Sequence, residues 1–237
     1  VFVGALTDSL GNYIIKNINY GNGTTFTVTP SLESIIGRSL EFDGVNDYID
    51  FSARRIELSN GFTIESWFKT PGASSDMILF STRNPVDQTV QLEVSMLASS
   101  SQLTVKYFDQ VTTVGEGLNN NLWHHWAVAV DTLNQTIEIY IDGGSSLGGS
   151  QSVELLSSNL IDDITVLSEL KIGSGLNNNA YFLGFMDESR VWSGPRTLDQ
   201  ITGTMNQTLV GNETGLSSYW NFNSGTGICL LYTSDAA

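Results

Sequence analysis

The sequence of 237 residues predicts an all-β fold built from antiparallel strands. Segments in which apolar and polar residues alternate recur along most of the chain, at spacings typical of a β-sandwich. Clusters of Gly, Pro, Asn and Asp separate these segments and favour turns. Only residues 197–205 have the pattern of a helix, a short one with Thr197 as its cap.

The distribution of strand patterns along the sequence divides the chain into three parts. Residues 1–30 contain two or three strand patterns, too few to close a core alone. Residues 31–226 contain the other strand patterns and are predicted to form the main domain. Residues 227–237 depart from the pattern and look like translated adaptor sequence, so Cys229 is given no functional weight. The alternatives are a hairpin of the main domain for the first part and a final strand for the last.

The main domain begins at residues 39–51, where two alternating segments flank an Asp-Gly turn. Alternation or apolar runs then predict further strands at residues 61–69, 77–81, 89–96, 102–108, 122–130, 136–141, 170–173, 182–192 and 216–222. The Gly- and Ser-rich residues 145–158 are expected to form a loop.

Charge narrows the classes of partner. Ten basic residues stand against 25 acidic ones, which gives a net charge of −15. This balance disfavours nucleic acid and anionic membrane surfaces, because both need basic patches. Acidic loops suit calcium and neutral hydroxylated ligands better. No apolar run approaches the roughly 18 residues of a membrane span, so no membrane insertion is expected.

Five motifs follow one another along residues 39–223. They are LEFDG at 40–44 with DYI at 47–49, FTIESW at 62–67, WHHWA at 123–127 with YIDG at 140–143, GFMDESRVW at 184–192, and YWNF at 219–222. In this order they resemble the laminin-G-like domain of the concanavalin A-like lectin/glucanase superfamily. The resemblance implies a jelly roll, in which two curved antiparallel sheets pack face to face.

The first part of the chain carries a separate resemblance. TDSLGNYIIKNINYG at residues 7–21 and FTVTP at 26–30 are similar to the end of a carboxypeptidase-regulatory-like, transthyretin-type β-sandwich repeat. Such repeats occur in tandem in large secreted bacterial surface proteins. The resemblance therefore implies that the chain is an internal piece of such a protein, located outside the cell or at the cell surface.

Catalysis is not expected. Glucanases of the superfamily carry a Glu-x-Asp-x-Glu pattern, which places acidic residues on one face of a strand. Here Glu41 and Asp43 are followed by Gly44 and Val45, so the third carboxylate is missing. His124 and His125 are adjacent and would point to opposite faces of a strand, one into the core and one to the surface. A glycoside hydrolase is the disfavoured alternative.

The resemblance also implies a calcium ion at one rim of the sandwich, held by oxygen ligands at strand ends. The implied ligands are Asp43, Asn46 and Asp47 in the Asp-Gly turn, and Asp187 and Glu188 late in the chain. The alternative is that the carboxylates of the turn cap its own backbone and that Asp187 pairs with Arg190.

Aromatic rings on the concave face of the sandwich can stack on sugar rings. The candidates are Trp67, Trp126, Tyr140 and Trp192, with core packing as the alternative role of each. Two Asn-rich stretches, residues 119–121 and 177–179, offer amides to ligand hydroxyls or form solvated turns.

These observations favour a non-catalytic recognition or adhesion module that binds carbohydrate or glycoprotein with the assistance of calcium. A structural spacer in a tandem surface array is the main alternative. The ligand and the oligomeric state are left open.

Overall fold

The computed structural model describes residues 39–51, 56–57, 60–83, 88–144, 150–154, 166–167 and 169–223. All of these lie within the predicted main domain. The predictions for residues 1–30 and 227–237 fall outside the described residues. Within the described part of the chain, no helix is long and apolar enough to cross a membrane.

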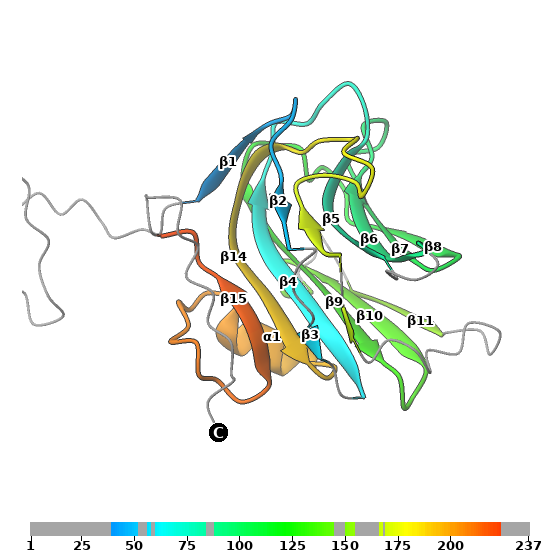
Figure 1. The fold of residues 1–237 in the computed structure, drawn as a ribbon, viewed down its shortest axis with the longest axis vertical. Coiled ribbons are helices and arrows are strands. Elements are labelled where there is room, and N and C mark those ends of the chain that lie inside the picture. The colour runs from blue at the N-terminus through cyan, green and yellow to red at the C-terminus, as the bar shows by residue number, and fades with distance from the viewer. Residues whose placement is uncertain are drawn as a thin grey trace, which may run out of the picture. The chain divides into compact units, whose positions relative to one another are not determined.

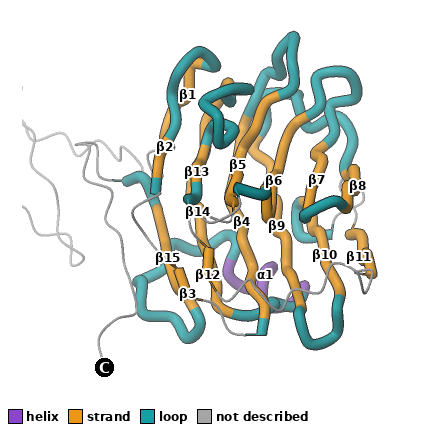
Figure 2. Tube along the Cα trace, turned by 45° about the vertical axis from the view of Figure 1, so that its right-hand side comes forward, coloured by secondary structure: helices purple, strands orange, loops and turns teal. Residues whose placement is uncertain are grey.

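The described residues form two antiparallel sheets that lie as separate layers in Figures 1 and 2. The seven-stranded sheet has the order β1 (Leu40–Asp43), β14 (Leu183–Ser193), β4 (Gly61–Lys69), β9 (Trp123–Asp131), β10 (Thr136–Ile141) and β11 (Ser150–Glu154), with β15 (Leu216–Trp220) paired to β14. The six-stranded sheet has the order β2 (Ile49–Asp50), β13 (Lys171–Ile172), β5 (Met77–Arg83), β6 (Val90–Met96), β7 (Leu103–Tyr107) and β8 (Gln110–Val114). A short pair joins β3 (Ile56–Glu57) to β12 (Val166–Leu167).

The main core lies between the two sheets. On β4, Phe62, Ile64 and Phe68 alternate with polar residues and are buried in this core. The facing sheet contributes alternate residues of β6, such as Leu92 and Val94. Two inner apolar faces and alternating outer residues are the arrangement of a β-sandwich, which confirms the predicted fold class.

The only helix among the described residues, α1 (Leu198–Thr204), covers part of the outside of the seven-stranded sheet. Thr197 caps it and forms a capping box with Gln200, as the sequence predicted for the start of this helix. Ile201 of the helix packs against Tyr140, Ala127 and Ala129, which point outward from β9 and β10. No helix lies over the outer face of the six-stranded sheet in the described part of the chain.

The prediction of a loop over residues 145–158 is wrong for part of its length. Residues 150–154 form β11, which pairs with β10 from Thr136 to Tyr140. Strand β8, Gln110–Val114, was not predicted either. Both are the last strands of their sheets. An edge strand is held by one backbone ladder and needs few apolar side chains, so its sequence carries little of the alternating pattern.

Candidate functional site

The structure buries most of the aromatic residues predicted to bind a ligand. Trp126, Tyr140 and Trp192 are 2%, 7% and 2% exposed. Trp126 belongs to the core between the sheets, Tyr140 lies beneath α1, and Trp192 packs in a smaller cluster outside β14. Trp67 is half-buried, and its Nε1 donates to the carbonyl oxygen of Met205 at 2.8 Å. Stacking on a sugar needs an open ring face, so the prediction of a ligand-binding role is corrected for the three buried rings, which are packing residues.

Asp43, Asn46 and Asp47, the first group of predicted calcium ligands, lie together in one turn. Asp43 Oδ1 accepts hydrogen bonds from the backbone N of Val45 at 2.8 Å and of Asn46 at 3.3 Å. Asp47 Oδ2 accepts one from the backbone N of Asp43 at 2.9 Å. One oxygen of each carboxylate therefore caps the turn, as the alternative interpretation expected.

The second predicted group, Asp187 and Glu188, is not brought to this turn. On β14 the residue opposite Asp43 is Leu183, so Asp187 lies four positions further, about 14 Å at about 3.4 Å per residue. Glu188 Oε2 accepts from Arg190 Nη2 at 2.7 Å, so Glu188 rather than Asp187 pairs with this arginine. The five residues do not fit a joint calcium site. The described residues contain no group of three or more His, Cys, Asp or Glu side chains arranged to hold a metal ion.

Both histidines of β9 are buried, so the prediction of one surface histidine is wrong. His124 Nδ1 lies 2.8 Å from Asp142 Oδ2 at the end of the neighbouring strand. His125 points to the other face, where its Nε2 lies 3.4 Å from Glu65 Oε2. The residues that follow β14 cover this face, which is why an outward-pointing histidine is still buried.

Glu65 and Arg190 form the centre of a buried charged network on that covered face. Arg190 Nη1 lies 3.4 Å from Glu65 Oε1 and donates to the carbonyl oxygen of Thr204 at 3.0 Å, while its Nη2 donates to that of Gln207 at 2.6 Å. Burial raises the pKa of Glu65, but His125 and Arg190 outweigh this effect and hold the pKa below its usual value. The network fastens the end of α1 to the sheet.

The outer face of the six-stranded sheet carries a row of polar residues in register on every strand except β8, where Val111 holds the position. The central row, from β2 to β8, is Asp50, Lys171, Ser81, Glu93, Lys106 and Val111. Flanking positions on the same face add Tyr48, Ser95, Thr104 and Thr113 on one side and Arg83 and Glu169 on the other. We call these twelve residues the polar face.

Tyr48 gives the polar face an exposed aromatic ring. It is 39% exposed, and its ring centroid lies 6.4 Å from that of Tyr181. Lys171 Nζ sits 4.6 Å from the centroid of the Tyr48 ring and 3.7 Å from Asp50 Oδ2, and it donates to Asn178 Oδ1. Lys171 thus ties β2 to residues 174–181 and holds the ring in place.

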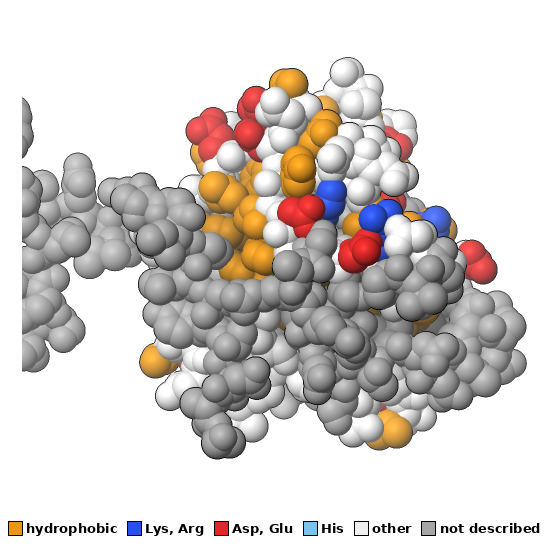
Figure 3. All heavy atoms as spheres, in the orientation of Figure 1, with side chains coloured by type: hydrophobic (Ala, Val, Ile, Leu, Met, Phe, Trp, Pro, Cys, Tyr) orange, Lys and Arg blue, Asp and Glu red, His pale blue; other side chains and the backbone are white. Residues whose placement is uncertain are grey.

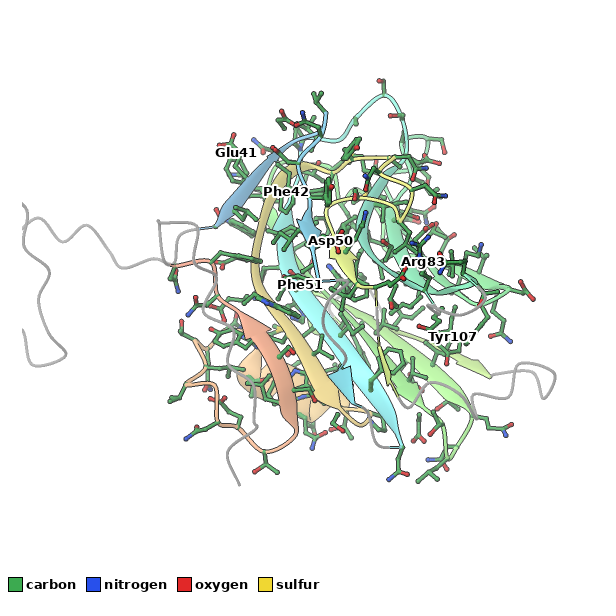
Figure 4. The ribbon with its side chains drawn as sticks, viewed as in Figure 1. Glu41, Phe42, Asp50, Phe51, Arg83 and Tyr107 are labelled. Atoms are coloured by element: carbon green, nitrogen blue, oxygen red, sulfur yellow. The ribbon has the colours of Figure 1, made fainter. Side chains whose placement is uncertain are left out.

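Apart from Val111, charged residues and hydroxyl groups occupy the rest of the polar face. Arg83 Nε donates to Glu169 Oε2. Burial raises the pKa of Glu93 above its ordinary value, and the positive charge of Lys106 opposes this shift. Figure 3 shows acidic and basic side chains next to one another on this side of the molecule, and Figure 4 labels Asp50 on β2 and Arg83 on β5. The arrangement offers both donors and acceptors to a hydroxylated ligand.

The fold and these motifs agree with a family comparison. A laminin G family model, described as the concanavalin A-like lectin/glucanases superfamily, matches residues 43–202. The chain belongs to this superfamily. The resemblance drawn from the five sequence motifs is thereby confirmed.

Solved structures show the same concanavalin A-like fold. A candidate carbohydrate-binding protein from Bacteroides ovatus is 17% identical with a TM-score of 0.58, and the match covers 80% of this chain but only 52% of that one. The CBM40 of the Ruminococcus gnavus IT-sialidase, bound to α2,3-sialyllactose, is 14% identical with a TM-score of 0.52 over 70% of this chain and 96% of that one. A heptameric SAP-like pentraxin from Limulus polyphemus is 14% identical with a TM-score of 0.52, over 68% and 78% of the two chains.

Sequence reasoning missed Tyr48 as a candidate ligand-binding residue of this concanavalin A-like domain. The signal was present, because alternation along residues 48–51 places Tyr48 and Asp50 on the face opposite Ile49 and Phe51. The Asn-rich residues 177–179 do reach the polar face, where Asn178 binds Lys171. In the other stretch, Asn120 Oδ1 accepts from the backbone N of Leu122 at 2.8 Å and caps its own turn.

Proposed function

We propose that the chain is a non-catalytic carbohydrate-binding module and that its polar face binds the glycan. Membership of the concanavalin A-like lectin/glucanases superfamily supports this function. So do two proteins with the same fold, the candidate carbohydrate-binding protein from Bacteroides ovatus and the Ruminococcus gnavus module bound to sialyllactose. Because these proteins are only 17% and 14% identical to this chain, the likeness extends only to the fold. Which face of the sandwich binds the glycan therefore has to be argued from the residues of this chain.

The observation that carries the proposal is Tyr48, an exposed ring at the edge of a row of polar groups. A sugar ring presents apolar C–H groups on one side and hydroxyl groups around its rim. Tyr48 can stack on the first, while Asp50 on the adjoining strand β2 can hydrogen-bond to the second. Ser95 and Thr113 lie three and five strands away and can hydrogen-bond to further units of an oligosaccharide. The backing by Lys171 and Tyr181 fixes the ring before the ligand arrives, which lowers the entropic cost of binding.

The non-catalytic part of the proposal rests on the carboxylates. Glu41 and Asp43 lie on β1, at the edge of the opposite sheet, and Asp43 closes its own turn. On the polar face, Asp50 and Glu169 are engaged by basic side chains. A glycosidase needs two carboxyl groups facing the scissile bond, one of them as a proton donor. We expect no release of reducing ends from glucans.

We place the module outside the cell or on the cell surface, in a larger protein that uses it for adhesion to carbohydrate or glycoprotein. The predicted secreted repeat at residues 1–30 supports this location. A spacer domain would need no ligand, so saturable glycan binding distinguishes the adhesion role from the spacer role.

The test is a glycan array with the full chain, followed by titration calorimetry on the glycans that bind. Tyr48→Ala should weaken binding about tenfold or more, equivalent to about 1.4 kcal/mol, because it removes the stacking ring. Trp123→Ala is the matched control, since Trp123 is 40% exposed on β9 of the opposite sheet. A folded sample that binds no glycan, or an equal loss in both variants, would contradict the proposal.

A further inference from the structure

We propose that the polar face selects neutral glycans over acidic ones, an inference that rests on the carbohydrate-binding function proposed above. The proposal is based on the positively charged side chains of this face, which already lie beside carboxylates of the protein. In the described part of the chain, the polar face holds three basic side chains, Arg83, Lys106 and Lys171, and each faces a carboxylate.

Lys171 is the most enclosed of the three. Its side chain is 8% exposed, and its ammonium group is surrounded by protein acceptors. Asp50 Oδ2 lies 3.7 Å from Nζ, Asn178 Oδ1 accepts a hydrogen bond, and the Leu176 carbonyl oxygen accepts another at 3.4 Å. A ligand carboxylate would have to displace these groups before it reached the ammonium group.

Arg83 is paired in the same way, and Lys106 lies opposite a carboxylate. Arg83 binds Glu169, and both side chains are about three-quarters buried, with 25% and 22% exposed. Lys106 is the register partner of Glu93, and its charge acts on that carboxylate. Each of the three cations on the face therefore lies beside one carboxylate, and their formal charges balance across the face.

Such a face treats two kinds of sugar differently. A hydroxyl group can donate to Asp50 or Glu169 and accept from Arg83 or Lys106, forming charge-assisted hydrogen bonds without separating the paired charges. The carboxylate of an acidic sugar would lose its hydration on binding, while the cations of the polar face are already paired with protein carboxylates. It would also lie close to those carboxylates, which repel it. The net charge of −15 adds repulsion at longer range.

The experiment uses matched ligands that differ only in this group. Glucosides and galactosides are titrated against the full chain alongside the corresponding glucuronides and galacturonides. We expect the neutral member of each pair to bind at least about tenfold more tightly. Glu169→Gln should release Arg83 and strengthen binding of the acidic member at least about threefold relative to the neutral one. Glu41→Gln, which makes the same change of charge on β1 of the other sheet, should leave the ratio unchanged.

The outcomes separate the two proposals. Equal or tighter binding of the acidic sugars by the native chain would overturn the selectivity and leave carbohydrate binding intact. A Glu169→Gln variant that behaves like Glu41→Gln would overturn the assignment of selectivity to these pairs. A folded sample that binds no member of the set and no glycan of the array would overturn the carbohydrate-binding function itself, and the selectivity with it.

Discussion

At the scale of single residues, breaking the buried Glu65–Arg190 ion pair is expected to cost more stability than breaking an ion pair at the surface. Arg190 is 1% exposed and contacts Glu65, Glu188 and two backbone carbonyl oxygens. Arg190→Met leaves two carboxylates without their cation, so we expect a loss of about 3–5 kcal/mol in the free energy of unfolding. Urea denaturation measures this loss.

The matched control for that measurement is Arg83→Met on the polar face. Arg83 also pairs with one glutamate, but its side chain is 25% exposed. Water can solvate the remaining Glu169, so the expected loss is about 1 kcal/mol or less. Equal losses in the two variants would show that the network around Arg190 is not a principal source of stability.

Asp187 predicts a dependence of stability on pH. Burial raises its pKa from the ordinary 3.8 to about 7, and Glu188 adds to the rise, while Arg190 and the Glu188 backbone N oppose it. Because the folded pKa lies above the unfolded one, the stabilising contribution is complete below about pH 4 and is lost as the pH rises to about 7. We therefore expect Asp187→Asn to gain in melting temperature relative to the native chain across this window, and to keep a constant difference above it. A constant difference from pH 4 to 8 would contradict the raised pKa.

The tryptophans Trp67 and Trp192 show what the alternation of residues along a strand predicts and what it leaves open. Alternation agrees with the position of Trp67 and Trp192 on the outer face of their strands, because neighbouring residues of a strand point to opposite sides. It did not show that residues after β14 cover this face, where Trp192 Nε1 donates to Glu65 Oε1 at 2.8 Å. Pointing outward and being exposed differ whenever a second layer of chain covers a sheet.

At the scale of elements, the Asp43–Asp47 turn is the remaining place for the predicted calcium ion. Its two carboxylates and the Asn46 amide supply fewer oxygens than the six to eight that calcium takes. We expect weak binding, with a rise in melting temperature only at millimolar calcium. Asp47→Asn should abolish this rise. Stabilisation at micromolar calcium, or none at about 10 mM, would contradict this assignment.

Strands of the sheet interiors were predictable because they carry the apolar pattern of the core. The polar face was not predictable from the sequence, because the pairing register of the strands decides which polar residues lie next to one another. Its central row joins Asp50, Ser81, Glu93, Lys106 and Lys171 from five strands spread over 122 positions of the chain. Hydrophobic periodicity fixes which face each residue occupies, whereas pairing between distant strands decides which residues meet.

At the scale of the whole molecule, the two sheets have different outer surfaces. The outside of the seven-stranded sheet carries α1 and the buried network around Glu65. In the described part of the chain, the six-stranded sheet has no helix over it and instead presents the polar face. This difference between the two outer faces supports the proposal that the ligand binds to the polar face, where Tyr48 supplies the exposed ring.

The net charge of −15 then predicts that folding and binding respond differently to salt. Raising NaCl from about 20 mM to about 300 mM shortens the Debye length and screens the repulsion among the excess acidic groups, so the melting temperature should rise. Neutral glycans meet charges that are already paired, so their Kd should change by less than about twofold over the same range. Scanning calorimetry and titration calorimetry measure the two effects, and KCl at equal ionic strength separates screening from a specific effect of sodium. A Kd that weakens strongly with salt would mean that unpaired charge on the protein attracts the ligand, contrary to the pairing on the polar face.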